Sequence, residues 1–178
     1  MKEVKIFARA GQGAITTAAI LGEALFLEGK YAYAFPHFGA ARMGAAMNAF
    51  LRFDEKPIRL RSKVYEPDYI IVVDPTLLES QKAFAGLKKG SKAVIAVREA
   101  TSVPQAKDVD VYKLEAERIA KEIIGRPFAN TVLLGAFSKV SGQVSLDSLL
   151  KAVEKRFSGK PEVLQKNLDA VKKGYDSV

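Results

Sequence analysis

Apolar residues along this chain alternate between short continuous runs and longer segments of helical periodicity. The short runs are typical of buried strands, and they predict strands at residues 4–8, 31–35, 47–53, 69–73, 93–97 and 109–112. The longer segments predict helices at residues 14–28, 76–86, 115–124, 130–140, 146–157 and 161–175. Strands that alternate with helices indicate an α/β protein with a layered sheet.

A few residues indicate where these elements begin and end. Pro36 is expected to stop the second strand, because proline cannot donate a hydrogen bond to a sheet ladder. The run Tyr69–Val73 has no polar interruption, which predicts a central strand covered on both faces. Asn130 and Ser145 are each interpreted as the N-cap of the helix that follows. Pro161 suits the first turn of the last helix.

Length and composition indicate one domain spanning residues 1–178, because a chain of 178 residues can bury a sizeable core. The absence of cysteine excludes disulfides and thiolate-bound iron–sulfur or zinc sites, and the single histidine, His37, argues against a self-contained transition-metal site. Any metal is therefore expected in a partner chain. No apolar run approaches the roughly 20 residues of a membrane span, and no signal-peptide pattern is present, so we expect a cytoplasmic protein without a membrane partner.

The chain is basic, with a formal net charge of +8 and a pI of about 9.6. Much of the excess comes from lysines scattered over predicted helices, a pattern typical of a solvated face, namely Lys82, Lys88, Lys89, Lys151, Lys155, Lys172 and Lys173. Charge alone does not distinguish a polyanionic cofactor from an acidic subunit. It is also the only feature that favours RNA, so we expect no nucleic acid partner.

The most informative local feature is the junction between the first strand and the first helix, where the sequence reads Arg9-Ala10-Gly11-Gln12-Gly13. The first N–H groups of a helix lack partners within the helix, and the helix dipole adds partial positive charge, so such a turn can hold an anion or a phosphate. The alternative is that the glycines only close a tight turn. The pattern is neither a Walker A loop nor a dinucleotide fingerprint, because Thr16 replaces the third glycine of the latter.

A second loop of interest is predicted at residues 37–45, where two glycines and small residues accompany Arg42. Small residues there would allow another backbone or a ligand to approach closely. His37 has no visible acidic or histidine partner in the sequence, so a structural or interface role is expected. Asp74 lies at the C-terminal end of a predicted central strand, where open sheets gather ligands, although a turn or helix-capping role is favoured.

Several motifs together resemble the gamma subunit of the 2-oxoacid:ferredoxin oxidoreductases, which corresponds to one internal domain of the single-chain enzymes. The resemblance runs nearly end to end. The segments that show the resemblance keep the family's order and spacing along the chain. They are Arg9–Gly13, Thr16–Ala19, Glu28–Pro36, Phe38–Arg42, Glu66–Tyr69, Val73–Pro75, Asn130–Gly135, Asn167–Ala170, Gly174 and Tyr175.

The resemblance implies a three-layer α/β/α sandwich around a mixed, mostly parallel sheet. It also implies a complex that converts a 2-oxoacid, CoA and oxidised ferredoxin into an acyl-CoA, CO2 and reduced ferredoxin. Thiamine diphosphate and iron–sulfur clusters would belong to partner subunits of alpha, beta and delta type. This chain would contribute to assembly and to part of the CoA site, with no catalytic residue and no metal of its own.

Two loops depart from the family pattern. The family's first loop usually reads G-x-G-G-Q-G, whereas Ala8 and Ala10 occupy two of its glycine positions here, which disfavours a positive φ at both. In the second loop, Ala41 replaces a glutamate and Met43 replaces an arginine, so Arg42 remains without its usual charged neighbours. These changes suggest a divergent member or a paralogue of the family. They leave the subunit identity in place but weaken the expectation that the family's ligand contacts are kept.

The residues expected to bind the cofactor are Arg9, Gly11, Gln12, Gly13, Thr16 and Arg42. Gly11 and Gly13 would let the backbone approach a phosphate, while Gln12 and Thr16 would add a side-chain amide and a hydroxyl. Arg42 could grip a CoA phosphate or a partner's carboxylate, with a surface ion pair as its alternative. The alternative for the whole chain is a stand-alone α/β module that binds a nucleotide or a small anion without catalysis.

Overall fold

The computed structural model describes residues 1–38 and 42–178, and within them it contains one six-stranded sheet with the order β2-β3-β1-β4-β5-β6. The strands are β1 (Lys2–Arg9), β2 (Tyr31–Phe38), β3 (Ala46–Asp54), β4 (Tyr69–Val72), β5 (Ser91–Ala96) and β6 (Val109–Leu114). Neighbouring strands are parallel from β1 through β4 and β5 to β6, whereas β3 runs antiparallel to both β1 and β2. The prediction of a mixed, mostly parallel sheet is therefore confirmed.

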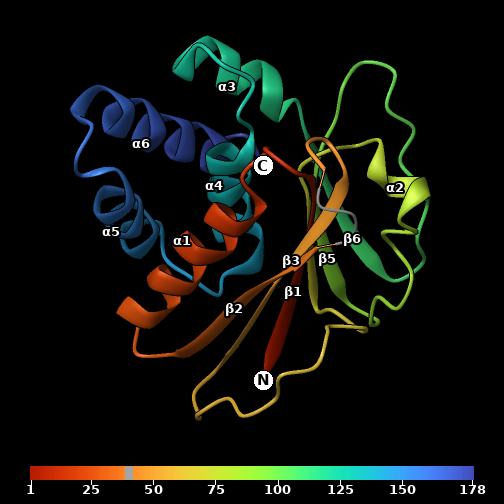
Figure 1. Cartoon of the computed structure of the whole chain (residues 1–178). Coiled ribbons are helices and arrows are strands. Elements are labelled where there is room, and N and C mark those ends of the chain that lie inside the picture. The colour runs from red at the N-terminus through yellow and green to blue at the C-terminus, as the bar shows by residue number, and fades with distance from the viewer. Residues whose placement is uncertain (39–41) are drawn as a thin grey trace.

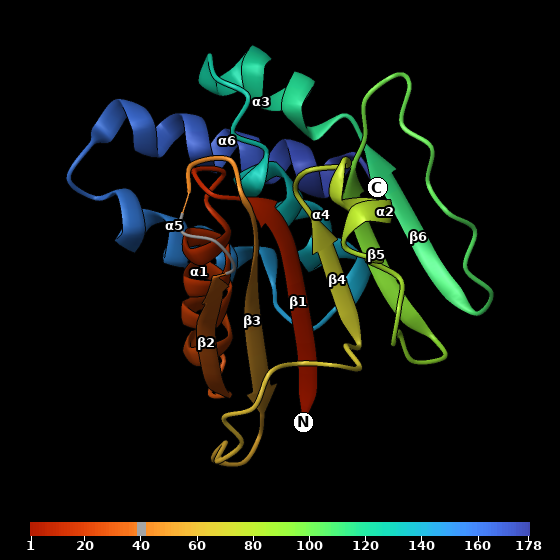
Figure 2. The ribbon, with the colours of Figure 1, turned by 45° about the vertical axis from the view of Figure 1, so that its right-hand side comes forward.

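Helices lie on both faces of the sheet, but the two layers are unequal. They are α1 (Ala14–Leu27), α2 (Leu77–Ser80), α3 (Ala116–Ile124), α4 (Asn130–Ser141), α5 (Leu146–Phe157) and α6 (Pro161–Asp176). Figure 1 shows α2 on one side of the sheet with irregular segments, and the other helices together on the opposite side. The turned view in Figure 2 shows the same division. No helix in the described ranges combines the length and the apolar character that crossing a membrane requires.

Side chains that alternate along the strands contribute to two apolar cores. On β4, Ile71 packs into the core beneath the larger helical layer, while Ile70 and Val72 pack into the smaller core with Leu77 of α2. All four residues of β4 are buried, and the strand lies between β1 and β5. The expectation of a central strand covered on both faces is thus confirmed for this run.

The prediction that Pro36 ends the second strand is wrong, because β2 continues through it to Phe38. Pro36 lies opposite Ala49 of β3, and β2 is the edge strand of the sheet among the described residues. An edge strand tolerates proline because one row of its backbone groups needs no partner. Two residues assigned to the following loop, His37 and Phe38, therefore belong to the sheet. The residues Gly39, Ala40 and Ala41 of that loop lie outside the described residues.

The helix predicted at residues 76–86 is much shorter than expected, since α2 covers only Leu77–Ser80. The chain then turns, with Lys82 at a φ of 45° and Gly86 at a φ of 78°. A Cβ at Gly86 would lie 2.4 Å from the carbonyl oxygen of Tyr65, so this turn fits closely against the neighbouring loop. Tertiary packing has overridden a helical pattern here.

Two glycines allow α4 and α6 to cross in backbone contact. A Cβ at Gly135 would lie 1.9 Å from the carbonyl oxygen of Val171, and a Cβ at Gly174 would lie 1.9 Å from that of Val132. Neither approach leaves room for a side chain. The buried Thr131 hydroxyl donates to Asn167 Oδ1 at 3.0 Å on the same pair of helices. Any larger residue at either glycine must push the helices apart.

We expect Gly135→Ala to reduce the free energy of unfolding by about 3 kcal/mol, because the added methyl group overpacks a backbone contact that cannot yield. Thermal and denaturant unfolding would measure the change. Gly159→Ala is the matched control, since a Cβ at Gly159 meets nothing within 4 Å. Equal stability of the two variants would contradict the proposed role of the crossing.

Candidate functional site

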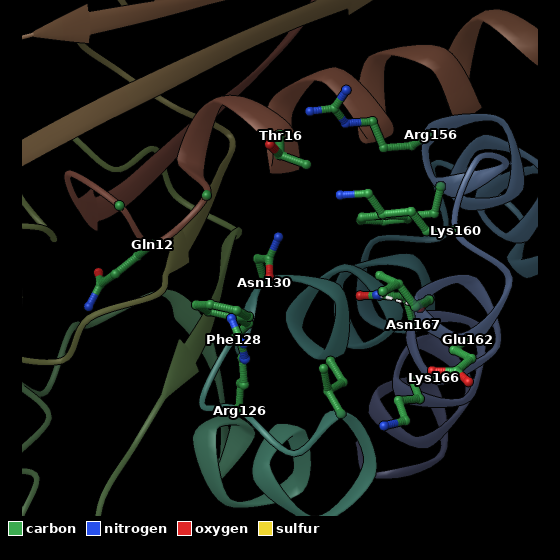
Figure 3. Close-up of a pocket in the computed structure, with 15 residues that line it drawn as sticks. Gln12, Thr16, Arg126, Phe128, Asn130, Arg156, Lys160, Glu162, Lys166 and Asn167 are labelled. Atoms are coloured by element: carbon green, nitrogen blue, oxygen red, sulfur yellow. Dashed lines mark hydrogen bonds between the residues drawn. The ribbon is translucent and has the colours of Figure 1, made fainter.

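A cavity of about 570 Å³ opens beside the glycine turn that follows β1. Its wall comes from the start of α1, the segment between α3 and α4, the connection between α5 and α6, and the first half of α6. Figure 3 shows these segments arranged around a common space. The cavity therefore lies at the C-terminal end of β1, the edge where parallel strands of α/β sheets gather ligands.

The glycine turn has the backbone conformation that only glycine adopts freely. Gly11 and Gly13 have φ angles of 99° and 83°. A Cβ at Gly13 would lie 3.0 Å from Asn130 Nδ2, so the turn also fits closely against the start of α4. Neither Ala8 nor Ala10 has a positive φ. The two alanines are thus compatible with this turn.

The start of α1 presents free donors beside the cavity. The N–H of Thr17 donates to Gly13 O at 2.8 Å, but those of Ala14, Ile15 and Thr16 have no acceptor within the described part of the chain. No side chain in the described ranges caps this helix. Uncapped N–H groups and the positive end of the helix dipole favour a bound anion.

Asn130 is not the N-cap that the sequence predicts. It is the first residue of α4, and the cap position belongs to Ala129, without a side-chain hydrogen bond. Asn130 is only 8% exposed, and its side chain forms no hydrogen bond with any described residue. Figure 3 shows its amide directed into the space between the glycine turn and Lys160. The amide atoms of Asn130 are not among the buried polar atoms without a partner in the described part of the chain, so they are open to the cavity and can hydrogen-bond to whatever occupies it.

Positive side chains surround the rest of the cavity. Arg126, Arg156, Lys160 and Lys166 line it, together with one carboxylate, that of Glu162. None of the four cations forms an ion pair with a described residue. The cavity is therefore suited to a polyanion. Among the described residues, no group of three or more His, Cys, Asp or Glu side chains is placed to hold a metal ion.

The remaining wall is apolar, and its lining side chains are those of Ile124, Phe128, Phe157 and Val163. Phe128 is 44% exposed, so its ring offers a face to a planar group. Sequence reasoning missed the cations and the aromatic residues of this wall because they come from distant segments. The only local signal was that most of them, though not Lys166, lie near predicted helix ends.

Two predicted site residues, Arg9 and Gln12, form hydrogen bonds within and beside the turn, and Gln12 also lines the cavity. Gln12 Oε1 accepts from the Arg9 N–H at 2.7 Å, and Gln12 Nε2 donates to Asp74 Oδ2 at 2.7 Å. The Arg9 guanidinium donates to the Thr76 hydroxyl at 2.8 Å and to the Gly44 carbonyl at 3.0 Å. Figure 3 shows the Gln12 side chain directed away from the other labelled residues.

Asp74 lies beneath the turn and joins these contacts. Its Oδ1 accepts from the Thr76 N–H at 3.0 Å, which confirms the predicted turn role, and its Oδ2 lies 3.3 Å from Arg9 Nε. Burial alone would raise the pKa of Asp74, but hydrogen bonds from Thr76 and Gln12, with the charge of Arg9, outweigh that effect and hold the pKa below its ordinary value. The ionised carboxylate is therefore the form that stabilises the turn.

The loop containing Arg42 lies next to the glycine turn. The Ala10 N–H donates to the Ala45 carbonyl at 2.9 Å, and the Gly44 N–H donates to the Ala10 carbonyl at 3.2 Å. Met43 Sδ would lie 3.0 Å from a Cβ at Gly11. Arg42 itself is exposed and is not part of the cavity wall. The two loops are thus neighbours, with Arg42 at the surface.

His37 lies apart from this cavity, on the face of β2 that carries aromatic side chains. Its ring stacks with that of Phe50 at a centroid distance of 6.1 Å. This contact agrees with the structural role expected for the residue.

We expect Asp74→Asn to reduce the free energy of unfolding by about 2 kcal/mol at pH 7, since an amide loses the charge interaction with Arg9 and places N–H donors against Gln12 or Thr76. The pKa of Asp74 is lower in the folded state than its ordinary value of 3.8. The extra stability of the wild type over Asp74→Asn is therefore complete above that value, and it shrinks as the pH falls through the folded-state pKa. Denaturant unfolding across a pH series would measure this difference. The exposed carboxylate Asp110 provides the control Asp110→Asn, which should leave stability at pH 7 unchanged.

A family model and curated relatives both match nearly the whole chain. The family model described as pyruvate ferredoxin/flavodoxin oxidoreductase matches residues 3–177. Pyruvate synthase subunit PorC of Methanothermobacter thermautotrophicus is 43% identical over 100% of this chain and 96% of its own length. The pyruvate/ketoisovalerate oxidoreductases common subunit gamma of Thermococcus litoralis is 42% identical over 99% of this chain and 96% of its own length.

Solved structures agree with this likeness. The pyruvate oxidoreductase subunit PORC of Thermotoga maritima has a TM-score of 0.82 and 33% identity, covering 99% of this chain and 96% of that one. A 2-oxoglutarate:ferredoxin oxidoreductase from Magnetococcus marinus, solved with coenzyme A bound, has a TM-score of 0.84 at 22% identity, covering 99% of this chain and 31% of that one. The second likeness concerns the fold alone. Because the family model and the relatives span nearly the whole chain, this protein belongs to the pyruvate ferredoxin/flavodoxin oxidoreductase family.

Proposed function

We propose that this chain is the gamma subunit of a thiamine-diphosphate-dependent 2-oxoacid:ferredoxin oxidoreductase. The complex would oxidise a 2-oxoacid in the presence of CoA to an acyl-CoA and CO2, and pass the electrons to ferredoxin. The observation that carries the proposal is end-to-end similarity to proteins named as gamma-type subunits of pyruvate and ketoisovalerate oxidoreductases.

In this proposal, the work of the complex is divided among its chains. Thiamine diphosphate and iron–sulfur clusters belong to alpha, beta and delta-type partners, because this chain has no cysteine to ligate a cluster. Residues 1–178 form a single domain without a catalytic residue, and the complex acts in the cytoplasm. Ferredoxin meets the complex through the other chains.

The contribution of this chain to chemistry is part of the CoA site, at the glycine turn. Free N–H groups at the start of α1 donate to a phosphate, and the Thr16 hydroxyl adds a further donor. Gly11 and Gly13 have no side chain to block that approach. The side chains of Arg9 and Gln12 hold the turn in shape beside the ligand. CoA bound to a protein of the same fold supports this assignment.

Arg42 has a different place in this proposal. It is exposed beside the glycine turn, and its planar guanidinium suits either a CoA phosphate arriving from a partner chain or a carboxylate of that partner. Both roles require an assembled complex.

A stand-alone nucleotide or anion-binding module is the second candidate function. One observation favours it, namely that the whole cationic cavity is built from this single chain. The two candidates differ in whether the chain has stable partners.

We expect the tagged chain, isolated from its native host under mild conditions, to be recovered with a thiamine-binding pair of chains and a cysteine-rich chain. Mass spectrometry would identify them, and the complex should reduce ferredoxin with a 2-oxoacid only when CoA is present. Recovery as a monomer or homo-oligomer would reject the subunit proposal and leave the binding module.

We expect Gly13→Ala to raise the KM for CoA of the complex about tenfold, because a side chain strains a positive φ and displaces Asn130 beside the bound phosphate. Steady-state kinetics at saturating 2-oxoacid would measure the effect. Gly29→Ala is the matched control, since Gly29 has a similar φ of 79° but meets nothing within 4 Å and lies at the other end of α1. A KM that rises equally in both variants would argue against the glycine turn as a CoA contact.

A further inference from the structure

We propose that the segment 56–65, in the connection between β3 and β4, docks against an acidic face of a partner chain in the complex. We call this segment the docking loop. The inference rests on the proposed function, and it adds which surface of this chain meets a partner and what chemistry that partner presents. The contacting side chains of the partner are carboxylates.

The docking loop is basic along its whole length and contains no acidic residue. Its cations are Lys56, Arg59, Arg61 and Lys63. All of them are exposed, and none forms an ion pair with a described residue. Exposed charge alone is typical of a solvated surface, and two further features distinguish this loop from such a surface.

The first feature is a backbone that is held in place although it has no regular structure. Arg52 of β3 is only 1% exposed, and its guanidinium donates to the carbonyls of Ser62 at 2.7 Å and Lys63 at 3.1 Å. Its Nε donates to Glu3 Oε1 at 2.7 Å, which compensates the buried charge. Val64 is buried between these points. A loop anchored in this way loses little conformational entropy when a partner binds.

The second feature is apolar and aromatic surface beside the cations. Leu60 is 45% exposed, and Tyr65 is 72% exposed. The guanidinium carbon of Arg61 lies 4.1 Å from the centroid of the Tyr33 ring, so the loop continues onto the aromatic side chains of β2. Arginine and tyrosine are enriched in protein interfaces and at the positions that dominate binding energy. The surface therefore has the composition of a protein contact.

The charge of the docking loop determines the kind of partner. A guanidinium binds a carboxylate through two parallel hydrogen bonds, and a lysine ammonium adds a less directional contact. Glu55 and Glu66 border the loop on both sides. Their charges would repel the continuous phosphates of a nucleic acid, which requires a longer basic stripe. An acidic protein surface is therefore the better match.

The docking loop lies at the opposite end of the sheet from the cavity. Arg52, which anchors the loop, is paired with Glu3 near the start of β1, whereas the glycine turn follows Arg9 at the end of that strand. Figure 2 shows the connection between β3 and β4 at the end of the sheet that carries the N-terminus. A ligand in the cavity therefore does not account for the cations of the loop.

The test measures how well variants of the docking loop enter the complex in the native host. A tagged copy of the chain is expressed beside the untagged wild type, and mass spectrometry compares the two in the complex and in the free pool. We expect Arg59→Glu/Lys63→Glu to enter the complex at least about tenfold less than the tagged wild type, because two repulsive charges replace two attractive ones. The melting temperature of the chain should stay unchanged, since neither side chain has an ion pair or a hydrogen bond within the described ranges.

Lys107→Glu/Lys113→Glu is the matched control. Both lysines are exposed, and they lie in or just before β6, at the other edge of the sheet from β2. This variant should enter the complex as well as the tagged wild type does. Equal entry of Arg59→Glu/Lys63→Glu and the wild type, or an equal loss in the control, would overturn the inference. Failure of the tagged wild type to enter any complex would instead reject the proposed function.

Cross-linking of the wild-type complex gives a second readout that does not depend on a variant. A carbodiimide joins a lysine amine directly to a carboxylate, and it should link Lys56 or Lys63 to an aspartate or glutamate of a partner chain. Links from these lysines only to residues of this chain would count against the inference. Nuclease treatment should leave the complex intact, and release of the partner by nuclease would also overturn the inference.

Discussion

The direct backbone contact between α4 and α6 is the constraint on which the cavity depends. Gly135 and Gly174 lack the side chains that normally keep two helices apart, so the backbones of α4 and α6 come into direct contact. The first half of α6 then continues past the start of α4 and supplies Asn167 and Lys166 to the cavity wall. The buried bond between Thr131 and Asn167 fixes the two helices relative to each other near this wall.

A second constraint acts from beneath the glycine turn. Asp74 follows β4, and its carboxylate reaches the turn after β1 through Gln12 and Arg9. Neighbouring parallel strands are thus joined at their C-terminal ends by a buried ionised group. Such a group costs free energy unless its oxygens are hydrogen-bonded, and here both oxygens have partners. The turn is therefore held in shape before any ligand arrives, which reduces the ordering cost of binding.

The distribution of charge follows from these constraints. Some surface lysines form ion pairs, as Lys151 does with Asp147 within α5 and Lys155 does with Glu23 of α1. The four cations around the cavity have no ion-pair partner among the described residues, and the packing of α3, α5 and α6 places them around one space. Part of the positive charge of the chain is therefore a local property of the cavity, which the total charge does not reveal.

Local sequence patterns are enough to predict the α/β class, the order of the elements, the buried strand β4 and the glycine turn, because these depend on residues close together along the chain. The tertiary structure decided what local patterns could not. It placed Pro36 within an edge strand, shortened the helix after Thr76, and turned Asn130 from an expected cap into a cavity residue. It also brought Arg126, Arg156 and Lys166 around the glycine turn. The physical reason is that edge position, packing and cavity walls depend on contacts between residues far apart in sequence, which periodicity and spacing do not encode.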